Sequence, residues 1–223
     1  MNQKTLDGSA GLVCNAGMFM KSFTSLSVGL LGLTWVATVP CQAETVHYLP
    51  VPNSSKVRMD GDSTVHKWHA ETDVIGGSLE LEADFPGNAS SAVVTPKVDV
   101  KIPVRSLKSS GGNRMDAVMM EHMKFTDHKT IEYRVLELAP KAGSAGQYDA
   151  KGALTVAGVT KTNTMAVTIE KVEGTKLKVT GKTALKMTDF GISPPAPDIG
   201  LGLIKTSDDV QLTFSWITAP KAP

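Results

Sequence analysis

The stretch KLKVTGKTALKM, at residues 176–187, alternates apolar and charged side chains with a period of two. Leu177, Val179 and Leu185 fall at odd positions, whereas the lysines fall at even ones. Because successive side chains of a strand point to opposite faces, this spacing predicts a strand with one apolar face and one row of lysines in water. A helix would spread the lysines around its whole circumference, so a helical reading is excluded.

Two earlier segments, 152–158 and 164–171, repeat the same arrangement, and Glu173-Gly174 is a predicted turn before the lysine-bearing strand. The apolar positions of these segments are Leu154, Val156, Met165, Val167 and Ile169. Consecutive alternating segments joined by short turns indicate an antiparallel meander with one dry face and one wet face.

The remaining chain after Thr45 is mostly short alternating runs, which predicts an all-β fold of about eight or nine strands. One helix is predicted at 114–123, because Met115, Val118 and Met119 recur at i, i+3 and i+4. Only 5% of the residues are aromatic, and several inward positions are small or flexible. This composition favours a closed antiparallel barrel with room for a ligand over a sandwich. On the residues alone, a barrel filled by its own side chains is equally compatible.

Residues 1–43 are predicted to be an N-terminal extension and a secretory signal peptide, followed by one domain at 44–220. Lys21 precedes an apolar run from Leu26 to Val39, and Cys41-Gln42-Ala43 supplies small residues for cleavage near Ala43. The run is short and interrupted for a membrane span, although an uncleaved anchor is the alternative. Cleavage would make the product periplasmic or secreted.

Several classes of chemistry find no support in the residues after position 43. Both cysteines, Cys14 and Cys41, precede that point, so no disulfide or thiolate site is expected. The remaining 21 basic and 21 acidic residues balance, which gives no reason to expect nucleic acid as a partner. His66 and His69 would face opposite ways on a strand, so no metal site is predicted. With no catalytic motif present, we do not expect an enzyme.

The segments GALTVAGVTK (152–161), KMTDFGISPP (186–195) and DDVQLTFSW (208–216), in this order, resemble the YceI-like family of lipid-binding proteins. His122-Met123 and STVHKW (63–68) resemble further parts of that family. The resemblance spans about Thr45 to Trp216, and KFTDHKTIEY departs from the family pattern because Phe125 stands alone. The resemblance implies an eight-stranded, lipocalin-like antiparallel barrel in the bacterial periplasm, whose lumen holds an isoprenoid quinone or a polyprenyl phosphate.

The predicted helix carries several methionines, and we expect it to cover one barrel mouth as a lid, since methionine adapts to imprecise apolar partners. The same methionines could also simply fill the barrel end as core. The candidate ligand-binding residues are Trp68, Met119, Met123, Tyr133, Leu154, Val156, Val167, Ile169, Phe190 and Phe214. Arg105, Lys108 and Lys205 are candidates for contact with a phosphate head group.

The sequence thus predicts a periplasmic binding or carrier protein for an isoprenoid lipid, with no cofactor apart from such a bound quinone or polyprenyl lipid. The alternative is an envelope-stress interaction domain with a filled barrel and no ligand. Transient contact with a membrane and a homodimer are both compatible with the sequence.

Overall fold

The computed structural model of the protein describes residues 44–82, 85, 93–196 and 204–221. The predicted leader at 1–43, including the cleavage position near Ala43, lies outside these residues. Within the described ranges, no helix combines the length and the apolarity needed to span a membrane.

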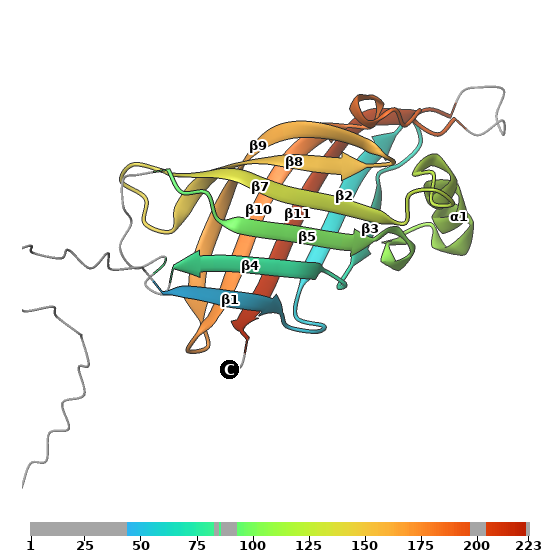
Figure 1. Cartoon of the computed structure of the whole chain (residues 1–223). Coiled ribbons are helices and arrows are strands. Elements are labelled where there is room, and N and C mark those ends of the chain that lie inside the picture. The colour runs from blue at the N-terminus through green and yellow to red at the C-terminus, as the bar shows by residue number, and fades with distance from the viewer. Residues whose placement is uncertain (1–43, 83–84, 86–92, 197–203, 222–223) are drawn as a thin grey trace, which may run out of the picture. The chain divides into compact units, whose positions relative to one another are not determined.

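The fold is a closed antiparallel β-barrel with eight strand positions, as the sequence predicted (Figure 1). The last strand pairs with the first, which closes the sheet on itself. The strands are β1 (Thr45–Pro50), β2 (Lys56–Ser63), β3 (Trp68–Thr72), β4 (Gly76–Glu82), β5 (Lys97–Pro103), β6 (Lys108–Ser109), β7 (Thr130–Pro140), β8 (Gln147–Val156), β9 (Val159–Val172), β10 (Lys176–Lys186) and β11 (Thr206–Pro220). Each neighbour in the sheet is antiparallel, so the barrel is an up-and-down meander.

The first barrel positions are each built from two strand segments. β1 and β2 both pair with β11, β1 near its C-terminal end and β2 along its N-terminal part. β3 and β4 then pair with β2 and β1, respectively, and continue the same division. The first break follows Pro50, which lacks a backbone N–H for the ladder.

One predicted strand ends earlier than the sequence pattern indicated. Val104 continues the period-two spacing of Val98, Val100 and Ile102 in the sequence, but it begins the short 3-10 helix η1 (Val104–Ser106). Pro103 ends β5, because its ring fixes φ and removes a donor from the ladder. Val104 is nonetheless buried in the apolar interior.

The lysine-bearing strand forms as predicted and sets the inside and outside of the barrel. Leu177 is fully buried, and Val179 lies opposite both Ile169 of β9 and Trp216 of β11. The turn before it is at Glu173-Gly174, where both residues have positive φ, at 44° and 79°. The apolar faces of neighbouring strands therefore share one interior.

The helix α1 (Gly112–His122) lies at one end of the barrel, beyond the ends of β5 and β7 (Figure 1). Asp116 anchors it to β6, because its carboxylate accepts hydrogen bonds from the backbone N–H of Ser109 at 2.7 Å and from Lys108 Nζ at 3.4 Å. Asp116 is only 5% exposed. The Ser109 hydrogen bond, aided by Lys108, holds the pKa of the carboxyl below its usual value.

We expect Asp116→Asn to lower the free energy of unfolding by about 1–3 kcal/mol at pH 7, because a buried charge-assisted anchor is lost. The folded state has the depressed pKa, so the stabilisation is present above about pH 4 and is lost as pH falls through the folded-state value. Denaturant unfolding at pH 7 and in acid measures this difference. The control Asp99→Asn removes an exposed ion pair with Arg134 and should cost at most about 1 kcal/mol. A variant as stable as the parent at pH 7 would contradict the anchor.

Candidate ligand-binding lumen

The barrel encloses an apolar lumen of about 680 Å³. At one end the wall is the cluster around Leu81, Met165 and Trp216, and at the α1 end it is the cluster around Met123 and Phe190. Tyr133 packs against both clusters, so the two apolar regions are continuous along the inside of the barrel. The inward faces of the strands thus leave a channel rather than filling it.

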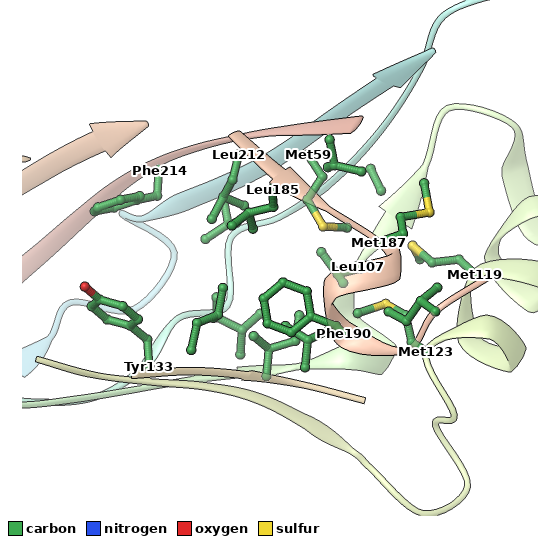
Figure 2. Close-up of a pocket in the computed structure, with 18 of the residues that line it drawn as sticks. Met59, Leu107, Met119, Met123, Tyr133, Leu185, Met187, Phe190, Leu212 and Phe214 are labelled. Atoms are coloured by element: carbon green, nitrogen blue, oxygen red, sulfur yellow. The ribbon is translucent and has the colours of Figure 1, made fainter. Parts of the chain in front are cut away.

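Every candidate ligand-binding residue predicted from the sequence lies on the wall of this lumen. Figure 2 labels five of them, Met119, Met123, Tyr133, Phe190 and Phe214. They are contributed by β3 (Trp68), α1 and the residue after it (Met119, Met123), β7 (Tyr133), β8 (Leu154, Val156), β9 (Val167, Ile169), the 3-10 helix η2 at Thr188–Phe190 (Phe190) and β11 (Phe214). Contact between these residues and a ligand stays a prediction.

Large aromatic side chains of the wall lie over glycines of the neighbouring strand, which keeps them out of the middle of the lumen. The pairs are Trp68 over Gly61, Tyr133 over Gly152 and Phe214 over Gly181. A Cβ at Gly181 would lie 2.8 Å from the Phe214 ring, and a Cβ at Gly61 or Gly152 would overlap the ring above it. Sequence reasoning missed these pairs, because they depend on which residues face each other across strands.

The lumen also contains hydrogen-bonding groups without strong partners. The Nε1 atoms of Trp68 and Trp216 are buried and have no hydrogen-bond partner within the described residues. Burial raises the pKa of Tyr133 to about 12, so its hydroxyl remains a donor at neutral pH. That hydroxyl lies 3.5 Å from the carbonyl oxygen of Ala150, which is a long and weak contact. The two indole N–H groups have no surface open to the lumen, whereas the Tyr133 hydroxyl can donate to an acceptor oxygen of a ligand.

The polar side chains of the wall gather at the α1 end. They include His66, Arg114, Glu121, His122 and Lys186. The head-group candidates Arg105, Lys108 and Lys205 are not among the lumen-lining residues in the described part of the chain. Lys108 instead pairs with Asp116 beneath the helix. The alternation of side chains indicated which residues point inward, but it carried no information on which end of the barrel is the polar mouth.

A seam in the barrel wall lies between β9 and β10. The two strands pair only between 166–172 and 176–182, although β9 begins at Val159 and β10 ends at Lys186. The helix η2 contacts both strands, and Phe190, which is 4% exposed, belongs to the α1-end cluster with Val156 and Met123. Phe190 therefore fills the wall where strand pairing has ended.

The described part of the protein contains no group of the side chains that most often bind metal ions. No three or more His, Cys, Asp or Glu side chains come together there in a group that could hold a metal ion. The chemistry that the lumen itself offers is burial of apolar surface, with a few hydrogen-bond donors and a charged mouth.

Solved structures with a similar fold cover most of the chain. BcnA of Burkholderia cenocepacia has a TM-score of 0.61 at 18% identity, over 75% of this chain and 98% of BcnA. A polyisoprenoid-binding domain of Saccharophagus degradans, implicated in plant cell wall breakdown, has a TM-score of 0.58 at 13% identity, over 79% and 99%. The YceI protein of Campylobacter jejuni has a TM-score of 0.51 at 17% identity, over 69% and 85%.

No curated protein matches the chain. The family model of the YceI-like domain matches residues 48–217, which run from β1 into β11 and include every strand that surrounds the lumen. The chain therefore belongs to the YceI-like family.

Proposed function

We propose that this protein binds an isoprenoid lipid in its barrel lumen and acts as a carrier rather than as an enzyme. The observation that carries the proposal is the continuous, unfilled apolar lumen of about 680 Å³. Burying apolar surface contributes about 25 cal/mol per Å², so a long apolar chain is the ligand that gains most there. The alternative of a filled barrel without ligand is disfavoured by the same open volume.

The volume of the lumen indicates how long a chain it can hold. A water-sized group occupies about 30 Å³ in a liquid, so the lumen has room for at least about twenty carbon groups, or about four isoprene units. The Tyr133 hydroxyl and the charged mouth favour a ligand with oxygen acceptors. An isoprenoid quinone or a polyprenyl phosphate combines these properties, and the related domain of Saccharophagus degradans is described as polyisoprenoid-binding.

The place of action that we propose is the periplasm, or the exterior after secretion, following cleavage near Ala43. The layout of residues 1–43 supports this proposal. In that setting a lumen for a lipid would serve to move or hold a molecule that water does not dissolve. N-terminal sequencing of the exported protein tests the cleavage position.

Organic extraction of freshly purified protein, followed by mass spectrometry, tests the ligand. We expect about one polyprenyl lipid per chain. With delipidated protein, a twenty-carbon isoprenoid should bind at least about tenfold more tightly than a ten-carbon one, because each buried CH₂ contributes about 0.8 kcal/mol before ordering costs. A polar chain of equal length is the matched control ligand. An empty extract, together with no binding of either isoprenoid, would reject the proposal.

A further inference from the structure

Methionines from separate parts of the chain meet at the α1 end of the lumen. Met59 comes from β2, and Met119 comes from α1. Met123 directly follows α1, and Met187 directly follows β10. All four belong to the same apolar cluster, and Figure 2 shows their side chains gathered in one region at this mouth. The lid helix and the barrel wall thus present thioether sulfurs to a common space.

His122 joins this group from the same face of α1 as Met119, three residues earlier, and it lines the same cavity. Its Nδ1 lies 2.9 Å from the carbonyl oxygen of Ser193. Because a carbonyl only accepts, Nδ1 carries the proton, which leaves Nε2 as the ring nitrogen that can bind a metal ion. A backbone carbonyl that fixes the tautomer in this way is the usual outer partner of a metal-bound histidine.

The electrostatic setting favours a monovalent cation over a divalent one. Met119, His122 and Met123 lie at the C-terminal end of α1, where the helix dipole is negative. The ligands themselves are neutral. Arg114 and Glu121 both line the same mouth, and Lys186 pairs with Asp209 at 2.8 Å, so the described residues give no surplus of negative charge to balance a second positive charge on the ion. Thioether sulfur selects Cu(I), whereas Zn²⁺ and Ca²⁺ depend on thiolate, imidazole and carboxylate sets.

We propose that the thioethers of Met59, Met119 and Met187, with Nε2 of His122, form a four-donor binding site for one Cu(I) ion, beside which Met123 packs. The ion would join α1 to the barrel wall and hold the lid over the lumen. No metal site was predicted from the sequence, because the pattern of histidines and cysteines indicates none and the convergence of Met59 and Met187 on the helix depends on the fold. The proposal rests on the mouth geometry and does not require a lipid in the lumen.

The test uses the full chain with Cys14→Ser and Cys41→Ser, since those thiols would also bind Cu(I). Under anaerobic, reducing conditions, the protein competes with the chelator bicinchoninate for Cu(I), and the chelator's absorbance reports the transferred metal. We expect one Cu(I) per chain, and X-ray absorption should show sulfur neighbours with one nitrogen. No transfer of Cu(I) from the chelator would overturn the proposal.

Single variants separate the proposed site from adventitious binding. Met59→Leu, Met119→Leu and His122→Gln should each weaken Cu(I) binding by at least about tenfold. Leucine keeps the volume of methionine, so unfolding curves should remain close to the parent. The control Met165→Leu, in the cluster at the other end of the lumen, should leave binding unchanged. Nitrogen-only coordination, or binding that is insensitive to the mouth methionines, would assign the metal to exposed histidines and overturn the site.

Discussion

Replacing Phe190 by alanine is expected to lower the free energy of unfolding by about 3–5 kcal/mol. Phe190 is 4% exposed and packs in the α1-end cluster with Leu154, Val156 and Met123. It also fills the wall at the seam where β9 and β10 no longer pair, so neighbouring strands cannot close over the cavity that alanine would leave. Denaturant unfolding monitored by circular dichroism measures the loss.

The control for this variant is Val65→Ala, in the turn between β2 and β3, where the side chain is 62% exposed. A truncation there should change stability by no more than about 0.5 kcal/mol. A loss below about 1 kcal/mol for Phe190→Ala would show that the seam closes without the ring. Under the proposed function, the same variant should also release a bound lipid faster, because the wall at the seam becomes thinner.

A methyl group added at Gly152 is expected to weaken binding of an isoprenoid by at least about tenfold. The Tyr133 ring lies against Gly152, and the added carbon would occupy the position of the ring. The ring must then turn away from the wall, and the lumen is the open space beside it. Tenfold corresponds to about 1.4 kcal/mol, which is the loss of only about two buried CH₂ groups from the ligand.

The second-site change Tyr133→Leu provides the decisive comparison for Gly152→Ala. A shorter side chain removes the overlap, so the double variant should recover most of the affinity that Gly152→Ala loses. Thr155→Ala, on the outward face of the same strand, is the control and should bind as the parent does. Fluorescence titration with a polyprenyl ligand measures all of these proteins. Unchanged affinity in Gly152→Ala would mean that the width of the lumen is not set by this pair.

The parts of the fold that the sequence predicted are those governed by a local period. The alternation around Leu177 and Val179 identified β10 and its inward face, and the same pattern identified β8, β9 and β11. The break after Pro50 was also predictable from proline chemistry. The end of β5 at Pro103 follows from the same chemistry, although Val104 continues the alternation in the sequence.

The residues of the candidate site likewise fall into those that a local period predicted and those that only the fold brings together. Inward-facing residues such as Leu154 and Ile169 followed from side-chain alternation, and the structure places them on the lumen wall. The convergence of Met59 and Met187 on α1 depends on strand register and on closure of the barrel, which no single segment encodes. The aromatic–glycine pairs depend on register in the same manner.

The last strand, β11, pairs with β10, β1 and β2, and Lys221 donates its backbone N–H to the carbonyl oxygen of His47 at 2.7 Å. During synthesis on the ribosome, β1 and β2 therefore have no neighbour on that side until β11 has been made. Such pairing between the two ends of the sequence is slow to form and leaves apolar faces open in the meantime. The nascent chain should accordingly bind chaperones that hold unfolded proteins until β11 has left the ribosome.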